Sequence, residues 1–420
     1  MLKNKYFKII LLIGIALRLV FALFAYHPDI VPLYFAGKVL KEGNVANFYD
    51  FMPNLPDTHD YLKVYPRNIF NYPPAVYFSL GGISILTTDL FNRAFLDNFL
   101  FDIVSILGTV QLYLLLLVLK LPFFAFDLGI LYFIRNIFTK DHNKNLASVL
   151  WLFNPVNLYA TYMMGQFDII PTFFVAVVLY RLAKGQINSK NILVSAFLLG
   201  IGGAFKIFPL LFLVPLASSS KKWLIRILTV GIGSATYLLS IVPFINSSGF
   251  RSTALIASQT TKSLYAAIPI SGGESIILYI SLLLFLYILF LLNPHPSKNL
   301  WQYFMLTLLS FFALTHFHPQ WLLWLTPFII LELTYTKFKN LLPALVMFFA
   351  YLFSLFFFDP GLTSRLFAPL VPSLYVAPGL VETLGLSLDY NFVRSILQSI
   401  FVGGLLYYFY IFAVPKLNKI

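Results

Sequence analysis

The chain has 420 residues, of which 59% are hydrophobic and only 11% are charged. Soluble domains carry roughly 25% charged residues, so water is not the main solvent of this protein. Its net charge of +13 comes from short basic clusters between apolar runs, which argues against nucleic-acid binding. The absence of cysteine excludes disulfides, thiolate metal sites and cysteine nucleophiles.

Apolar runs of roughly 17 to 25 residues, the length that crosses a bilayer, follow one another along the chain. We therefore expect an all-α fold, a polytopic transmembrane helical bundle in which residues 1–420 form a single membrane domain. The sequence predicts about twelve spans, at residues 8–25, 74–90, 103–120, 123–139, 146–163, 168–184, 223–244, 274–293, 300–316, 320–335, 340–358 and 395–415.

Residues 191–217 interrupt this pattern with Gly200, Gly202, Gly203 and Pro209 around the cation Lys206. Helix breakers inside an apolar run predict a re-entrant or broken helix that returns to its starting side, buried in protein or beside a cavity. A single crossing would instead move the following basic residues of 221–226 to the outer side, against the positive-inside rule.

With a cytoplasmic N-terminus, most of the 29 Lys and Arg residues fall on the cytoplasmic side of the predicted spans. We expect an integral protein of the plasma or inner membrane with both termini in the cytoplasm. Residues 27–73 then form the first non-cytoplasmic loop and 359–394 the last. Because these are the longer loops, the site is expected on the non-cytoplasmic side.

Asp29 stands at the start of the first outer loop, directly after the first apolar helix. A carboxylate at that position suits a general base if it reaches the hydroxyl that it activates. The competing interpretation is a helix cap at the membrane surface. Further along the loop, Tyr72 precedes two prolines in a polar, aromatic stretch. Asp57, His59 and Asp60 have metal-ligand chemistry, but their spacing matches no known metal signature.

The outer turn between the predicted fifth and sixth spans carries Gln166 and Asp168. Both side chains can bond sugar hydroxyls, although Asp168 can equally serve as the N-cap of the next helix. Asp127 lies inside a predicted span, where a carboxylate is costly unless paired. We expect a structural ion pair for it, with Arg18 or Lys120 as the partner.

Lys206 must be paired, hydrated or bound to an anionic ligand such as phosphate, because it sits in an apolar run beside a helix break. The turn before the tenth predicted span contains His316, His318 and Gln320. These histidines can contact phosphate or sugar, cap a helix or bind zinc, though no complete zinc ligand set is visible. Arg365, in the last outer loop, can clamp a phosphate or be a plain surface residue.

Taken in order, several motifs resemble the GT-C superfamily of polytopic membrane glycosyltransferases, in particular mannosyltransferase-like members that use polyprenyl-phosphate sugars. The motifs are Asp29 with Tyr34, Gly43 and Tyr49, then Tyr72-Pro73-Pro74, Leu121-Pro122 with Asp127, Asn154-Pro155, Gly165-Gln166-x-Asp168, Phe205-Lys206-x-Phe208-Pro209 and His318-Pro319-Gln320. They cover residues 29 to about 330.

The resemblance implies a polyprenyl-phosphate-sugar lipid as donor, an acceptor that is a glycan, a lipid-linked molecule or a protein, and inverting transfer of a hexose such as mannose. It makes Asp29 the catalytic base. The developing charge on the leaving phosphate needs fixed donors, for which Lys206, His318 and Arg365 are the candidates. We expect Tyr72, Gln166, Asp168, His316 and Gln320 to bind the substrates.

Ile30 follows Asp29 where several relatives carry a second acidic residue, so the sequence indicates no metal or other cofactor, although a divalent ion is not excluded. The expected partners are the two substrates and membrane lipids. The alternative function is a secondary transporter or flippase of a lipid-linked or anionic substrate, which also has broken helices. No inverted repeat is visible, because the long early loop has no counterpart in the second half.

Overall fold

The computed structural model describes residues 4–87, 90–185, 187–255, 261–292, 299–316 and 318–417. These residues are mostly helical, in agreement with the all-α prediction apart from one small hairpin. Its strands, β1 (Ala267–Ser271) and β2 (Glu274–Ile277), pair antiparallel with Ala267 opposite Ile277.

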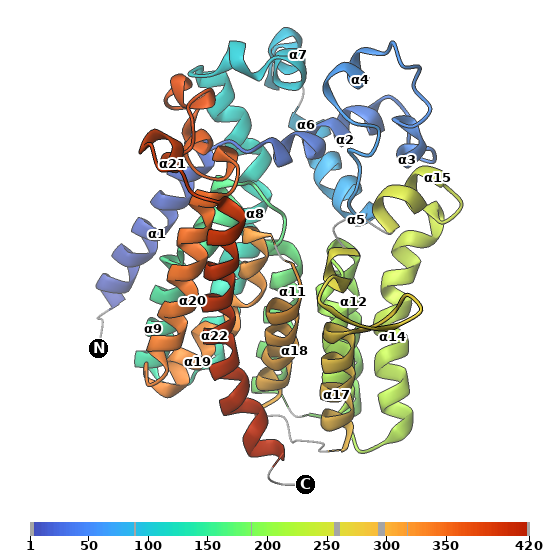
Figure 1. The fold of residues 1–420 in the computed structure, drawn as a ribbon, viewed down its shortest axis with the longest axis vertical. Helices are drawn as coiled ribbons and strands as arrows, with labels where there is room; N and C mark the ends of the chain where they lie inside the picture. Colours follow the sequence, from blue (N-terminus) through green and yellow to red (C-terminus); the bar gives the residue numbers. More distant parts are fainter. Residues whose placement is uncertain are drawn as a thin grey trace.

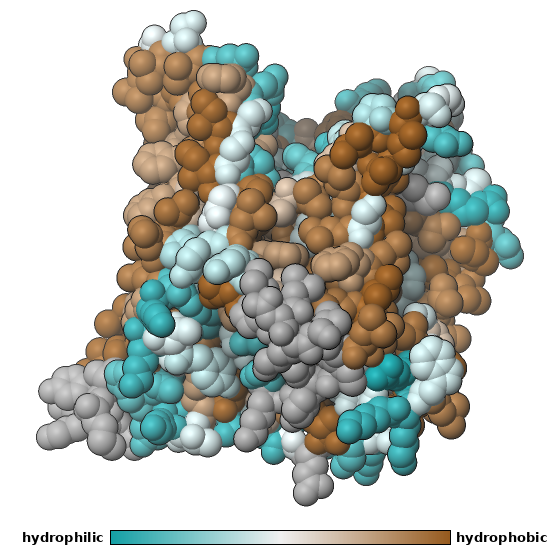
Figure 2. All heavy atoms as spheres, turned by 60° about the horizontal axis from the view of Figure 1, so that its bottom comes forward, coloured by the Kyte–Doolittle hydropathy of each residue, from teal (hydrophilic) through white to brown (hydrophobic). Residues whose placement is uncertain are grey.

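The long helices run side by side, and both marked ends of the chain lie in the lower half of the molecule as drawn in Figure 1. Hydrophobic side chains cover most of its sides in Figure 2, and hydrophilic ones gather toward its ends. This arrangement is that of an integral membrane protein. The helices are α1 (Asn4–Phe24), α8 (Val110–Ile137), α9 (Asp141–Leu152), α11 (Ile169–Lys184), α12 (Ser189–Phe205), α14 (Trp223–Ile241), α17 (Leu278–Leu292), α18 (Leu300–Leu314), α19 (Thr326–Thr336), α20 (Leu341–Ser354) and α22 (Tyr390–Leu417).

Short helices fill the connections. Between α1 and α8 lie η1 (Pro28–Ile30), α2 (Val31–Lys41), α3 (Phe48–Phe51), α4 (Asp60–Val64), α5 (Pro74–Val76), η2 (Tyr77–Gly81), α6 (Gly82–Thr87), α7 (Arg93–Phe101) and η4 (Ile103–Ile106). The rest are α10 (Pro155–Asn157), η5 (Leu158–Met163), η6 (Phe208–Phe212), α13 (Leu213–Ala217), η7 (Val242–Phe244), α15 (Ser248–Phe250), η8 (Arg251–Leu255), η9 (Lys262–Leu264), η11 (Pro319–Trp324), η12 (Leu355–Phe357), η13 (Pro360–Leu362), η14 (Ser364–Phe367), η15 (Pro372–Tyr375) and α21 (Leu380–Thr383).

The structure does not confirm twelve spans. Within the described residues, four helices are long and apolar enough to cross a membrane alone, and six shorter apolar helices accompany them. The two spans predicted at 103–120 and 123–139 are wrong as separate helices, because α8 runs unbroken through Pro122. Proline removes only one backbone donor, and neighbouring helices accommodate such a residue inside a membrane helix.

Residues 74–87, most of the predicted second span, pack against α2 of the predicted first loop. Helices η2 and α6 contact α2, and Figure 1 shows α6 and α7 at the same end of the molecule as α2. Glycines allow the approach, since a Cβ on Gly37 would lie 2.6 Å from the carbonyl oxygen of Gly81. An ion pair of 3.3 Å between Lys38 and Asp97 holds α7 on the same layer. The layer of helices around α2 therefore includes residues beyond 73, the predicted end of the first loop.

Residues 189–217 form two helical pieces that meet at Lys206. Helix α12 ends at Phe205, and η6 with α13 follows after the break. Gly233 of α14 lies against Ala196, and Gly200, one turn later in α12, lies against Gly233 and Thr236. Helices α12 and α14 therefore run in the same direction, so the chain between them leads back to the end from which α12 began.

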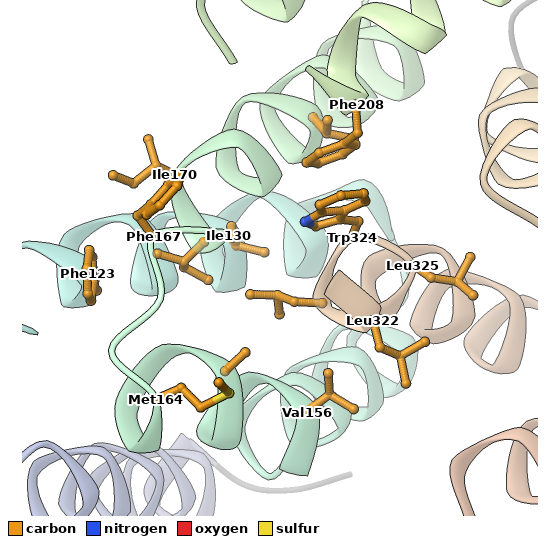
Figure 3. Close-up of a cluster of buried hydrophobic side chains, with 14 of the residues drawn as sticks. Phe123, Ile130, Val156, Met164, Phe167, Ile170, Phe208, Leu322, Trp324 and Leu325 are labelled. Carbon is orange, nitrogen blue, oxygen red and sulfur yellow. The ribbon is translucent and has the colours of Figure 1, made fainter. Parts of the chain in front are cut away.

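A buried hydrophobic cluster lies directly beneath this break (Figure 3). Its centre is Trp324 of η11, which stacks on Phe208 at 4.4 Å between ring centres and 8° between planes. Helices from distant parts of the chain add Phe123, Ile130, Val156, Met164, Phe167, Ile170, Leu322 and Leu325. Close packing of this cluster fixes the positions of the break and of the turn at 164–168.

Candidate active site

Asp29 lies in η1, a single turn that follows α1 after three intervening residues. The ring nitrogen Nδ1 of His27 accepts a hydrogen bond of 3.2 Å from the backbone N–H of Asp29 and so caps this turn. The side chain of Asp29 is 40% exposed, and the amide of Gln166 donates a hydrogen bond to Oδ2. The carboxylate is thus held in place by one partner while remaining open to a ligand.

His27 is a neighbour of Asp29 that the sequence analysis did not assign to the site. Its Nδ1 lies 3.5 Å from the Oδ2 of Asp29, but burial lowers the pKa of the imidazole more than the carboxylate raises it. His27 is therefore neutral near pH 7, and its contact with Asp29 is not an ion pair. The sequence signal for this role was a histidine directly before Pro-Asp, because a side chain at that position can cap the following turn.

The turn at 164–168 connects the two halves of the site. Gly165 has a φ of +67°, and a Cβ there would lie 3.1 Å from Ile30, so the position requires glycine. Beyond it, Gln166 and Asp168 are both buried. Gln166 holds Asp29, and Asp168 holds Lys206, so one turn binds the predicted base and the predicted cation.

Lys206 is paired rather than free. Its Nζ lies 2.8 and 3.0 Å from the two carboxylate oxygens of Asp168, and the indole N–H of Trp324 donates to Oδ1 of Asp168 at 2.5 Å. Asp168 occupies the N-cap position of α11, yet its side chain makes no capping bond. The sequence left three possibilities for Lys206, namely pairing, hydration or an anionic ligand. The structure shows pairing with Asp168.

Aromatic rings surround the ammonium of Lys206. Its Nζ lies 5.2 to 6.0 Å from the ring centres of Tyr72, Phe167, Trp321 and Trp324, within the range of cation–π attraction. The ring of Tyr72 also meets Phe167 edge-on at 4.7 Å. Burial raises the pKa of the Tyr72 hydroxyl, which stays protonated, and the charge of Asp29 adds to this shift.

Asp29 and Lys206 are close enough for their charges to interact. The structure thereby brings together Tyr72, Gln166, Asp168 and these two residues, five of the predicted site residues. Such a group of polar residues beside buried aromatic rings is typical of a substrate site.

His318 extends the site along the other side of Trp321. The two ring centres lie 5.0 Å apart, and the ring of His316 follows 5.3 Å beyond His318. Burial, with help from the charges of His316 and Lys206, lowers the pKa of His318 to about 4. His318 is therefore a neutral hydrogen-bonding group at pH 7. Gln320 is buried in the next turn.

Arg365 lies in η14, which packs against the chain that leads to Asp29. The backbone N–H of Tyr26 donates to the carbonyl of Leu366 at 2.8 Å, and the Tyr159 hydroxyl donates to the carbonyl of Leu362 at 2.9 Å. Within the described residues, the buried Nε of Arg365 has no hydrogen-bond partner. A buried donor without a partner is costly, so this atom is a place where a ligand oxygen would bind.

Asp127 is structural, as predicted, and its partner is Arg18. The guanidinium Nε lies 2.5 Å from Oδ2, and Asp127 also accepts bonds from Trp151, Asn157 and Tyr162. Lys120 instead donates to the last carbonyls of the α1 segment, those of Ala22 and Ala25. Every oxygen of this buried carboxylate is occupied, which leaves no room for a ligand.

The acidic trio of the first loop is structural too. Asp57 pairs with Arg67 at 2.5 Å, Asp60 with Lys63 at 2.7 Å, and His59 caps α4. In the part of the chain that the structure describes, no three side chains of His, Asp or Glu gather as a metal site. That the protein needs no divalent ion stays a prediction.

Comparison with known proteins agrees with this geometry. Residues 70–266 match the family model of glycosyltransferase family 87, and this stretch holds Tyr72, Gln166, Asp168 and Lys206. GPI mannosyltransferase 1 of Eremothecium gossypii is 27% identical over 127 residues, which are 29% of this chain and 30% of that protein. The chain thus matches less than a third of the length of that relative.

Fold and site together define a helical integral membrane protein with a polar site beside buried aromatic rings. Within that type, its particular similarity is to glycosyltransferase family 87 and, more distantly, to a mannosyltransferase. The resemblance predicted from the motifs is therefore confirmed.

Proposed function

We propose that this protein is an inverting glycosyltransferase that moves a sugar, a hexose such as mannose, from a polyprenyl-phosphate donor. The acceptor is a lipid-linked molecule, a glycan or a protein on the non-cytoplasmic face. The observation that carries the proposal is the placement of Asp29. Its carboxylate is partly exposed, bonded by Gln166 and close to a cation set among aromatic rings.

In this reaction Asp29 takes the proton of the acceptor hydroxyl. The acceptor oxygen attacks the anomeric carbon of the sugar while the bond from that carbon to the phosphate oxygen breaks. The electron pair of that bond leaves with the polyprenyl phosphate, and attack from the opposite face inverts the anomeric configuration. The hydrogen bond from Gln166 aims the carboxylate, a form of positioning that accounts for much of the catalysis in such sites.

The leaving phosphate requires donors that are already oriented in a site with little water. Arg365 offers the buried Nε that has no other partner within the described residues. His318 offers a neutral ring N–H, and Lys206 offers its remaining N–H at the positive end of the ion pair with Asp168. Tyr72, Gln166, Asp168, His316 and Gln320 complete the proposed substrate contacts, and no metal is assigned.

The test is transfer of radiolabelled mannose by the purified full chain in liposomes. Polyprenyl-phosphate mannose and a nucleotide-linked mannose are offered as separate donors, with a lipid extract as acceptor. We expect label to enter a glycosidic product only from the polyprenyl-phosphate donor, with the anomeric configuration opposite to that of the donor. Transfer from the nucleotide sugar, or retention of configuration, contradicts the proposal.

The alternative function, a transporter or flippase, gives a different result in the same liposomes. It predicts that the labelled donor crosses the bilayer chemically unchanged and that no new glycosidic bond forms. This alternative is tested because transporters also contain broken helices, and this chain has such a break at Lys206.

A further inference from the structure

A cavity with a volume of about 650 Å³ and both polar and apolar walls opens beside the turn that carries His316. Its walls come from the segment before β1, the ends of α18 and α20 and the start of α22, helices that lie next to one another in Figure 1. The residues on which the argument depends are Lys262, His316, Tyr351, Phe358 and Arg394.

The charges on this wall are all positive. Lys262 and Arg394 line the cavity, and no carboxylate does. No ion pair joins either cation to an acidic residue of the described chain; Arg394 instead donates to the side chain of Asn391 and covers the ring of Phe358 at 4.8 Å. Their charges add to the effect of burial in lowering the pKa of His316. This is the reverse of Lys206, whose charge is neutralised by Asp168.

Tyr351 provides an independent sign of a ligand. Its side chain is only 4% exposed, yet within the described residues its hydroxyl has no hydrogen-bond partner. An unpaired buried hydroxyl is destabilising, so it is retained where something else satisfies it. A hydroxyl donor beside two unpaired cations fits an oxyanion.

We propose that this cavity binds a phosphate group carried on a lipid chain, and this inference rests on the proposed function, in which that phosphate is the donor's before it moves to the transfer position at Lys206, His318 and Arg365. The volume exceeds that of a phosphate ion, and Leu314 and Phe358 give the cavity apolar walls on which an attached hydrocarbon chain can lie. Arg394 and Lys262 bind the phosphate oxygens, and Tyr351 donates a hydrogen bond to them.

Ring contacts connect the cavity to the residues around Lys206. The ring of His316 meets His318, whose neighbour Trp321 lies over Lys206. A phosphate held at Arg394 therefore lies beside the proposed site rather than on a separate surface.

Binding is measured with the purified full chain and with polyprenyl phosphate, phosphate-free polyprenol and inorganic phosphate as probes. We expect Arg394→Gln and Lys262→Gln each to weaken binding of polyprenyl phosphate about tenfold or more. Arg251→Gln, which removes an exposed arginine at the same end of the molecule, is the matched control and should bind as the wild type does. Equal binding by all three variants overturns the inference.

Tyr351→Phe separates a ligand contact from a structural role. Because the hydroxyl has no partner within the described chain, its removal should leave the thermal midpoint unchanged or higher while polyprenyl phosphate binds several-fold more weakly. A lower midpoint with unchanged binding contradicts the proposed contact. Polyprenol binding as tightly as polyprenyl phosphate, or inorganic phosphate binding as tightly as the lipid, contradicts a lipid-borne phosphate as the ligand.

The transfer assay distinguishes the two proposals. If mannose is transferred but Arg394→Gln leaves the KM for the donor unchanged, the cavity is not the phosphate site and the proposed function stands. If Arg394 is needed for binding of polyprenyl phosphate but no sugar is transferred from any donor, the cavity is confirmed and the proposed function fails.

Discussion

Lys206 and Asp168 form a buried bidentate ion pair, with Nζ 2.8 and 3.0 Å from the two carboxylate oxygens. Asp168 directly precedes α11 and Lys206 directly follows α12, so the pair fastens two helices at the point where α12 breaks. Two residues before Asp168 in the same turn, Gln166 holds Asp29. Loss of the pair would therefore affect both stability and the placement of the carboxylate.

The ion pair itself gives the first prediction. Asp168→Asn or Lys206→Met alone should destabilise the protein by about 3 to 5 kcal/mol, because the remaining charge is buried without a partner. The double variant should regain most of this stability. Asp97→Asn, which breaks the more exposed pair with Lys38, is the control and should cost less than about 1 kcal/mol. Thermal midpoints in detergent measure all four, and a double variant no more stable than either single variant contradicts a direct pair.

If the double variant folds, it also separates the two roles of Lys206. Kinetics with the donor and acceptor varied in turn show whether the cation binds donor phosphate. We expect the KM for the donor to rise by about tenfold and the KM for the acceptor to change less. An equal rise in both would mean that Lys206 acts only through the fold.

Gln166 is predicted to be a positioning residue. Gln166→Met keeps the volume of the side chain but removes the hydrogen bond to Asp29, so kcat should fall by roughly tenfold to a hundredfold with little change in thermal midpoint. Gln166→Glu should be worse, because a second carboxylate would then face Asp29. A variant Gln166→Met with wild-type kcat shows that Asp29 needs no such support.

The network around Asp127 should affect stability alone. Arg18→Met leaves Asp127 buried without its cation and should cost about 3 to 5 kcal/mol. Enzyme that remains folded should keep its KM values for both substrates, because this network lies outside the site. Asp141→Asn, which removes an exposed carboxylate 3.9 Å from Lys144, serves as the control and should leave the midpoint unchanged.

His318 should make stability sensitive to acid. Its pKa is about 4 in the folded protein and about 6.5 in an unfolded chain, so the unfolded state binds more protons between these values. Stability from this residue is therefore present above about pH 6.5 and is lost as the pH falls toward 4. Thermal midpoints at pH 7 and pH 5 should differ less for His318→Asn than for the wild type. Equal differences contradict a buried neutral His318.

Much of the bundle could be predicted from hydrophobic runs, since α14, α18, α20 and α22 lie close to their expected ranges. The length of an apolar run does not show which protein surface the run contacts. Residues 74–87 pack against α2, a contact that a run-length criterion cannot reveal. Pro122 looked like a boundary because the sequence does not show how its neighbours accommodate it.

Residue type and the free-energy cost of burying a charge in an apolar run identified the buried charged residues, but not their partners. A lysine in an apolar run must be satisfied, so Lys206 was recognisable, yet its pairing with Asp168 depends on a turn 38 residues away. Lys262 and Arg394 were overlooked because each looks like an ordinary loop or helix-end cation. Only the folded chain brings them to one cavity with Tyr351.

The central claim is that Asp29 removes the proton of the acceptor, and a comparison of Asp29→Asn with Asp57→Asn tests it most directly. Asp57 is a carboxylate of the same loop that is 96% exposed and pairs only with Arg67. Both variants should express and melt like the wild type. The rate of mannose transfer from polyprenyl-phosphate mannose should fall by roughly a thousandfold or more for Asp29→Asn. It should stay near wild type for Asp57→Asn. Near-normal transfer by folded Asp29→Asn contradicts the account.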